Sequence, residues 1–348
     1  MRKIVALMLA FVVMFAGCGK AKTADELMKN AYSDFLKETS YETNFEMTLD
    51  VDDEKLSEEM KQAVAMLKGS KVTADMRAIV KDGVNLDLNA EAMFMGQAYE
   101  MFMYADNEEF MFKLDNEMLK LESPEIIGKY IVMNLPAIKE EMEAMGESTA
   151  KLDVKAEYER QMKLVKENYE GVIDSVKDRL VLTEKEDGYD VTLDVTIEDV
   201  KAYLVGAIEL ALNEDEATLD SLKTIYTDEN LTDEEIKALY MEELNTQLDG
   251  GIALMGMMGI NIDEMKMTYM LDKDGKFKGS NFSLVVSIKA EETATIRLNA
   301  KSEYKNVGNV TEIVKPEVTE ENSIDFMEMM KAQMLAPTPA VEVIGETE

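Results

Sequence analysis

Apolar and polar residues alternate along much of this chain, and this alternation predicts strands that bury one face of a sheet. The first such run follows Ser40, where Tyr41, Phe45 and Val51 share one side and polar residues occupy the other. Turns such as Asp187-Gly188 separate the runs, so we expect antiparallel hairpins. Strands are predicted over 41–51, 71–81 and 84–92, in three short segments between 96 and 121, and over 180–184, 189–197, 265–271, 282–288 and 294–304.

Helical periodicity interrupts this pattern. A capping box at Thr23-Ala24-Asp25-Glu26 precedes an apolar stripe that ends near Phe35, which predicts a helix. Ser123-Pro124-Glu125 has the form of a second helix start, and Ile126 to Ile131 supply its apolar side until Pro136 breaks or kinks it. Further helices are expected at 52–68, 158–176, 198–212, 215–226, 233–248 and Ser323–Leu335.

The order of elements is a helix, many strands, a helical middle and more strands. The economical architecture is α+β: one large twisted antiparallel sheet whose apolar face is covered by helices. No stretch rich in Pro, Gly or Ser flanks the helical middle, which disfavours two separate domains. We expect one domain over 24–317, with its helical middle at about 123–176 and 198–248, and an acidic, partly disordered tail over 318–348.

The N-terminus has the pattern of a secretory signal peptide. Two basic residues precede an uninterrupted apolar run from Ile4 to Phe15, which is too short to span a bilayer. Small residues directly precede Cys18, the only cysteine, and this sequence resembles a bacterial lipobox. The resemblance implies a signal peptide over 1–17, lipidation of Cys18 and a tether over 18–23. We therefore predict a protein anchored by its lipid on the extracytoplasmic side of the cell membrane.

Composition narrows the classes of function. Hydrophobic residues make up 46% of the chain, enough for a core, while 71 acidic and 37 basic residues give a net charge of −34. Such acidity excludes nucleic-acid binding, which needs a basic face. The absence of histidine removes His-based triads and the usual zinc sites. We predict no catalytic residues, no cofactor and no metal site; catalysis by carboxylates alone stays chemically feasible, but no pair among the 71 acids is singled out.

Several segments together resemble the LolA-like lipoproteins of bacteria, of the Gram-positive type. They are the lipobox followed by a helix, Ser40-Tyr41 leading into a strand, Asp272-Lys273-Asp274-Gly275-Lys276 between long strands, Tyr304-Lys305-Asn306-Val307-Gly308, and Pro316-Glu317. The resemblance covers roughly residues 24–317, with a longer helical middle and a more acidic body than the family pattern. It implies a half-barrel sheet with helices on the concave side, in some members around an apolar cavity for lipids or acyl chains.

Methionine is the main compositional oddity, with 29 residues. Its flexible, polarizable side chain suits surfaces that repack around varied apolar ligands, so we expect some of these residues to line a lipid site. The candidates are Met93, Met95, Met101, Phe102 and Met103 in the first group of strands, and Met255, Met257, Met258, Met265 and Met267 near the last group. The alternative, that methionine replaces leucine in an ordinary core, stays open. Capture of Cu(I) by thioethers is disfavoured without histidine or a free cysteine.

Three local patterns have more than one interpretation. The segment from Tyr99 to Tyr104 is apolar on both sides, so it is covered twice or faces a cavity, a partner or a second copy. The glycine-rich segment 250–259 is either a mobile lip over a cavity or a buried irregular connection. Asp272-Lys273-Asp274-Gly275 resembles the start of a calcium loop, but the twelfth position is Ser283 instead of glutamate, which favours a hairpin turn.

Two functions remain after these exclusions. The first is a non-catalytic, membrane-anchored protein that binds a hydrophobic ligand, a lipid or an acyl chain. The second is a surface lipoprotein with a structural or protein–protein interaction role and no ligand. An apolar space between the sheet and the helices would favour the first, and a close-packed interior the second.

Overall fold

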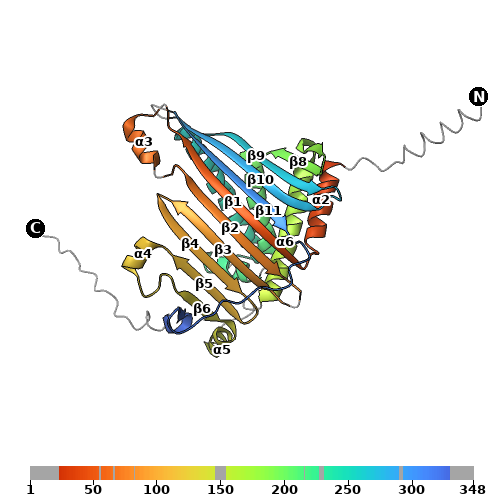
Figure 1. The fold of residues 1–348 in the computed structure, drawn as a ribbon. Coiled ribbons are helices and arrows are strands. Elements are labelled where there is room, and N and C mark those ends of the chain that lie inside the picture. The colour runs from red at the N-terminus through yellow and green to blue at the C-terminus, as the bar shows by residue number, and fades with distance from the viewer. Residues whose placement is uncertain are drawn as a thin grey trace, which may run out of the picture.

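A computed structural model describes residues 23–329, except 55, 66, 82, 146–153, 215, 227–230 and 290–292. Within these residues, twelve strands form one sheet in the order β12-β6-β5-β4-β3-β2-β1-β11-β10-β9-β8-β7. Every neighbouring pair is antiparallel except β12 and β6. The prediction of an α+β protein built on one large, mostly antiparallel sheet is confirmed (Figure 1).

The strands fall into an N-terminal and a C-terminal group. The N-terminal group is β1 (Ser40–Asp52), β2 (Ser70–Ile79), β3 (Asn85–Phe94), β4 (Gln97–Ala105), β5 (Glu109–Asp115) and β6 (Tyr130–Asn134). The C-terminal group is β7 (Val181–Lys185), β8 (Gly188–Asp194), β9 (Ile260–Asp272), β10 (Phe277–Lys289), β11 (Thr293–Lys305) and the short β12 (Ser323–Asp325). The two groups join in the middle of the sheet, where β1 pairs with β11 from Glu42 opposite Lys305 to Asp52 opposite Thr295.

The helices are α2 (Ala24–Phe35), α3 (Glu58–Ala65), α4 (Glu117–Glu122), α5 (Leu135–Met145), α6 (Val154–Val176), α7 (Ile197–Glu214), α8 (Glu216–Lys223) and α9 (Asp233–Met257). The predicted capping box at the start of α2 is present, because Thr23 and Glu26 exchange side-chain to backbone hydrogen bonds. Helices α2 and α6 lie side by side, joined by an ion pair between Lys29 and Asp174. Among the described residues, no helix is both long and apolar enough to cross a membrane.

Strand register divides the sheet into two faces. Cross-strand partners point to the same face, so Met101, Ala90, Ala74, Phe45, Ser302, Ser280 and Tyr269 form one row across seven strands. We call the side of this row the interior face, because helices α2 and α6 pack against it. The adjacent row belongs to the outer face and contains Phe102, Asn89, Asp75, Asn44 and Glu303.

One closed core lies where the helices meet the interior face at the β8–β9 side of the sheet. Leu27 and Met28 of α2 are 2% and 0% exposed, and they pack with Ile173 of α6, Val191 of β8 and Leu271 of β9. A separate cluster joins helices α7, α8 and α9 around Leu212, Leu219, Leu222 and Ile236. The helical middle therefore has a core of its own beside the one it shares with the sheet.

A second closed core lies on the outer face, under residues 306–322, which we call the C-terminal strap. The strap is fixed to the start of β1, where the N–H groups of Gly308 and Val310 donate to the carbonyl and hydroxyl oxygens of Ser40 over 2.7 and 3.1 Å. Its Ile313 packs on Tyr104 of β4 and Met111 of β5. In Figure 1 the strap is the dark blue segment that crosses in front of the sheet to reach β12. The outer side of the apolar segment 99–104 is therefore covered at Tyr104, which is 3% exposed.

The predicted helix from Ser123 to Ile131 is wrong. Residues 124–128 form a turn, and β6 follows, because Ile131 and Val132 pair with β5 on one side and with β12 on the other. Pro136 lies in the first turn of α5, where its missing N–H removes no helical hydrogen bond. The third short strand predicted before Leu121 is helix α4, which starts because the side chain of Asn116 accepts the N–H of Leu119 over 2.9 Å.

Two expectations near the C-terminal strands also need correction. The glycine-rich segment 250–259 is neither a lip nor an irregular connection: α9 continues through it to Met257, and Gly259 then adopts a φ of +71° before β9. The predicted helix from Ser323 begins instead with strand β12, and residues 326–329 are helical. The first helix, the β7–β8 hairpin, the helices predicted at 158–176, 198–212, 215–226 and 233–248, and the three long strands β9–β11 are confirmed. Cys18, the predicted signal peptide, most of the tether and the tail beyond 329 lie outside the described residues.

Candidate functional site

The centre of the interior face is apolar but only half-buried. Most large apolar side chains in this area keep partial solvent exposure, although Met265, opposite Leu284, and Val51, two residues after Leu49, are 9% and 2% exposed. The central side chains of the two closed cores are almost fully buried. The half-buried residues are Phe45, Met47, Leu49, Met76, Leu88, Met101, Met103, Phe112, Leu284 and Leu298. Proteins normally bury such a surface, so incomplete burial over seven neighbouring strands, from β5 to β10, marks it as a candidate ligand surface.

The structure separates the methionines that the sequence grouped together. Met101, Met103, Met265 and Met267 lie on the interior face of β4 and β9. Met93 lies on the outer face at the end of β3, and Met95 lies in the β3–β4 turn, with 44% and 49% of their surfaces exposed.

The remaining predicted lining residues lie elsewhere. Phe102 points to the outer face, where its ring meets that of Tyr130 edge-on at 5.7 Å. Met255 is half-buried near the end of α9, while Met257 and Met258 are 78% and 51% exposed at that helix end. The interior face therefore brings together four of the ten predicted residues.

An aromatic group that the sequence did not reveal lies at the end of the interior face where β1 begins and β9 and β11 finish. We call it the tyrosine cluster; its members are Tyr32 of α2, Tyr41, Tyr269 and Tyr304 of the sheet, Tyr158 and Tyr169 of α6, and Tyr203 of α7. The rings of Tyr32 and Tyr169 stack with centroids 3.9 Å apart. Phe35 and Phe277 fill the gaps, with Phe35 4.8 Å from the ring of Tyr304.

The surroundings of the tyrosine cluster are poor in charge. Burial, with a smaller contribution from neighbouring tyrosines, raises the pKa of Tyr32 and of Tyr269 to about 12. Burial also raises the pKa of Tyr41 and, most strongly, that of Tyr169. Among the described residues, the groups that perturb these four hydroxyls are all tyrosines. The hydroxyls are thus neutral hydrogen-bonding groups at any physiological pH.

Small hydroxyl residues adjoin the tyrosine cluster on the interior face. The hydroxyls of Ser280 and Ser302, on neighbouring strands, are 2.9 Å apart. Thr43 is the cross-strand partner of Tyr304. The hydroxyl oxygens of Thr43 and Tyr169 are buried, and neither has a hydrogen-bond partner among the described residues. A buried polar atom without a partner is unusual in a folded protein and calls for an explanation.

Tyr41, Tyr269 and Tyr304 lie in strands that the sequence predicts, at 41–51, 265–271 and 294–304. Their convergence depends on two facts that no local pattern contains. The first is that β1 and β11, whose paired residues are more than 240 positions apart in the sequence, pair in the centre of the sheet. The second is that α2 and α6 lie next to each other, which brings Tyr32 onto Tyr169. The available signal in the sequence was weak: the chain contains 13 tyrosines and 11 phenylalanines, and a buried tyrosine needs a hydrogen-bond partner.

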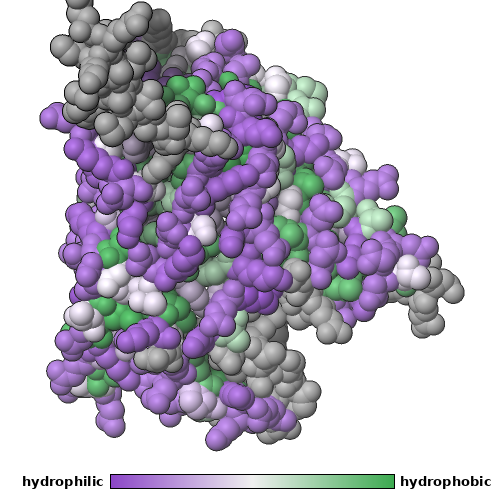
Figure 2. Space-filling model, turned by 90° about the vertical axis from the view of Figure 1, so that its right-hand side faces the viewer, coloured by the Kyte–Doolittle hydropathy of each residue, from purple (hydrophilic) through white to green (hydrophobic). Residues whose placement is uncertain are grey.

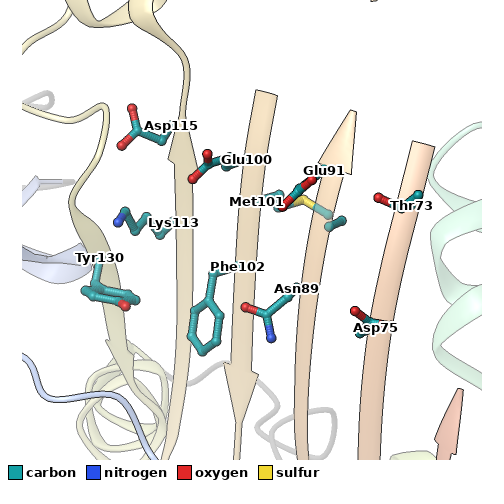
Figure 3. A pocket seen from close by; sticks show the side chains of 11 residues that line it. Thr73, Asp75, Asn89, Glu91, Glu100, Met101, Phe102, Lys113, Asp115 and Tyr130 are labelled. Carbon is teal, nitrogen blue, oxygen red and sulfur yellow. The ribbon is translucent and has the colours of Figure 1, made fainter. Parts of the chain in front are cut away.

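The outer face carries a hollow of about 350 Å³ above strands β2 to β6 (Figure 3). Carboxylates from four strands surround it, Asp75, Glu91, Glu100 and Asp115, together with Lys113. Lys113 lies 5.5 Å above the ring of Tyr130. Met101 forms part of the floor from its strand, although register assigns its side chain to the interior face. We interpret this hollow as the solvated side of an acidic sheet.

Metal chemistry finds no support in the described part of the chain, where no group of three or more acidic residues has the geometry to hold an ion. The segment at Asp272 is a hairpin turn, as its sequence favoured, because its carboxylate accepts the N–H groups of Asp274 and Lys276 over 2.9 and 2.8 Å. The surface over α2, α6 and β8 is mainly hydrophilic, with apolar residues in small groups (Figure 2). No protein-family model matches the sequence, and no curated protein matches it significantly.

Proposed function

We propose that this protein is a lipid-anchored extracytoplasmic protein that binds a hydrophobic ligand, a lipid or an acyl chain, between its sheet and its helices. The half-buried centre of the interior face carries the proposal. A ligand that covered this surface would be stabilised by about 25 cal/mol for each Å² of apolar area removed from water. The two closed cores indicate that the same chain buries apolar residues fully elsewhere, so the incomplete burial is local.

The anchoring half of the proposal rests on the N-terminal sequence. The apolar run to Phe15 and the small residues before Cys18 favour lipidation of that cysteine. Two acyl chains on one residue would give stable attachment to the membrane. The first residue of the folded part, Ala24, begins α2, so the interior face would stay close to the membrane surface. A wide sheet with helices on one side also fits the LolA-like lipoproteins, which we propose as the family.

The decisive experiment uses a soluble form that begins at Gly19, purified from cells and analysed by native mass spectrometry and by binding of the uncharged fluorescent probe N-phenylnaphthylamine. We expect lipid to copurify and the probe to bind. Replacing Met101 and Met103 by Gln should weaken probe binding about tenfold, because it removes apolar contact from the interior face. The matched control replaces Met93 and Met95 by Gln and should leave binding within about twofold.

Two results would contradict the proposal. If no lipid copurifies and the probe does not bind the unmodified protein, the alternative of an interaction lipoprotein without a ligand replaces it. If both double variants weaken the probe equally, the binding surface is not the interior face. Circular dichroism of each variant establishes that loss of binding does not reflect loss of the fold.

A further inference from the structure

We infer that the ligand is a fatty-acyl ester with an uncharged head, and that the tyrosine cluster binds its ester group. The inference rests on the proposed function and goes further by assigning the polar end of the ligand and the residues that recognise it. It starts from Tyr169 on α6 and Thr43 on β1, two of the four hydroxyls that are buried without a hydrogen-bond partner among the described residues; the other two are Ser70 and Ser287.

The two hydroxyls belong to one polar region. Tyr304 is the cross-strand partner of Thr43, and Tyr304 also lies close enough to Tyr169 to affect its pKa. Ser302, two residues before Tyr304, shares a hydroxyl contact with Ser280. Towards the other end of the strands the interior face is mainly apolar, with Phe45, Met47 and Leu49 along β1, although the buried hydroxyl of Ser70 lies opposite Leu49. The face thus has an end rich in hydroxyls and a mainly apolar end, which matches an amphiphile lying along the strands.

The chemistry of the polar end selects the head group. A phenol and a threonine hydroxyl both donate hydrogen bonds, and each lacks an acceptor among the described residues. An ester offers a carbonyl oxygen as acceptor and carries no charge. A carboxylate or a phosphate would also accept, but burying an anion requires a cation nearby. The groups that perturb the cluster hydroxyls are tyrosines, with no lysine or arginine among them in the described residues.

The test compares three competitors of the same chain length for displacement of N-phenylnaphthylamine: glyceryl monodecanoate, the decanoate anion and decane. The unmodified protein should bind the neutral ester at least roughly tenfold more tightly than the anion at neutral pH. Tyr169→Phe and Thr43→Val each remove one hydroxyl and keep the shape. Each should weaken the ester about five- to tenfold and leave decane within about twofold.

Matched controls lie outside the tyrosine cluster. Tyr226→Phe removes a hydroxyl that bonds Glu243 at the α8–α9 end, and Thr48→Val changes β1 on its outer face. Both controls should leave all three competitors unchanged. Thermal unfolding gives a second measurement: without ligand, Tyr169→Phe and Thr43→Val should be as stable as the unmodified protein or more stable, because each removes an unpartnered polar atom. A purely structural hydroxyl would give the opposite sign.

The outcomes separate this inference from the proposed function. If decane and the ester displace the probe equally, or if the two variants bind the ester normally, the tyrosine cluster does not recognise the head group and this inference alone fails. The same holds if the anion binds more tightly than the ester. If none of the competitors displaces the probe from the unmodified protein, the proposed function fails and the inference fails with it.

Discussion

Met103 and Met111 lie on neighbouring strands, one position apart in register, and they differ because they point to opposite faces of the sheet. Met111 is 0% exposed on the outer face, where the C-terminal strap covers it together with Tyr104. Met103 is half-buried on the interior face, although that face is the side on which helices pack. The side expected to be wet thus contains a closed core, and the side expected to be dry contains an open surface.

This difference indicates what the two regions are for. The strap covers a small apolar patch on the outer face with few residues, which demonstrates that this sequence can bury apolar side chains completely. The interior face is much larger and has several helices beside it, yet its central residues stay partly exposed. The apolar patch under the strap has the properties of an ordinary core, which stabilises the fold. The interior face contributes less to the stability of the fold than its apolar area suggests, and we expect it to stabilise the protein more when a ligand covers it.

The largest effect should come from a charge placed under the strap. Ile313 is 6% exposed and packs on Met111, whereas the next residue, Val314, is 66% exposed. Ile313→Asp would bury an unpaired carboxylate and should lower the free energy of unfolding by about 4 kcal/mol. Val314→Asp should change it by less than about 0.5 kcal/mol. Urea unfolding of both variants measures the difference; equal stabilities would mean that the strap does not cover the outer face.

The next test applies the same substitution to both methionines. Met111→Ala leaves a cavity in a closed core and should cost about 3 kcal/mol of unfolding free energy. Met103→Ala removes a side chain that already faces some solvent and should cost about 1 kcal/mol or less. At saturating ligand, Met103→Ala should lower the free energy of unfolding by more than it does without ligand, whereas the effect of Met111→Ala should not change. Similar costs for the two variants without ligand would remove the distinction between the faces.

Much of the sheet was predictable, because each strand carries its own alternation. Tyr41 to Val51, the β7–β8 hairpin and the three long C-terminal strands needed only local sequence. The failures occurred where long-range pairing outweighs local preference. Ser123-Pro124-Glu125 has the form of a helix start, but Ile131 and Val132 find partners on β5 and β12, and β12 comes from nearly 200 residues later. The continuation of α9 through its glycines also escaped prediction, because isolated glycine weakens a helix without forbidding it.

The candidate site was less predictable than the fold. Composition pointed to methionine, and Met101, Met103, Met265 and Met267 do share the interior face. The same argument included Met257, which is 78% exposed at a helix end. The tyrosine cluster depends on six elements meeting, and sequence periodicity indicates which side of an element is buried but not which element packs against it. The closed core on the outer face was predictable in part. The apolar side chains of Phe102 and Tyr104 indicated that something covers this side of β4, but only the structure identifies the strap as that cover.

A smaller, pH-dependent effect on stability is expected at the turn between β4 and β5, beside the apolar patch under the strap. Burial alone would raise the pKa of Asp106, but hydrogen bonds from the N–H groups of Glu108 and Glu109 and from the Tyr104 hydroxyl lower it overall. A lowered pKa stabilises the fold above the unfolded value of about 4, and this stabilisation disappears as the pH falls through the folded value. Asp106→Asn should therefore cost about 1 to 2 kcal/mol at neutral pH, with a smaller cost at acidic pH. Urea unfolding at several pH values measures it; a cost independent of pH would assign Asp106 no ionic role.

The smallest effect concerns the rim of the sheet, at the turn between β3 and β4. Phe94 pairs with Gln97, so Met95 and Gly96 form a two-residue turn, and their φ angles are +54° and +73°. This left-handed geometry favours Asn-Gly, and methionine is strained in it. Met95→Asn should therefore stabilise the protein by about 0.5–1 kcal/mol. Met93→Asn, on the adjacent strand, should be slightly destabilising, because asparagine disfavours strands.

If ligand binding is confined to the interior face, Met95→Asn will bind the fluorescent probe as the unmodified protein does. A stabilised variant that loses the probe would show that the strained methionine belongs to the binding surface, and that this surface extends from the half-buried centre of the sheet to its exposed rim.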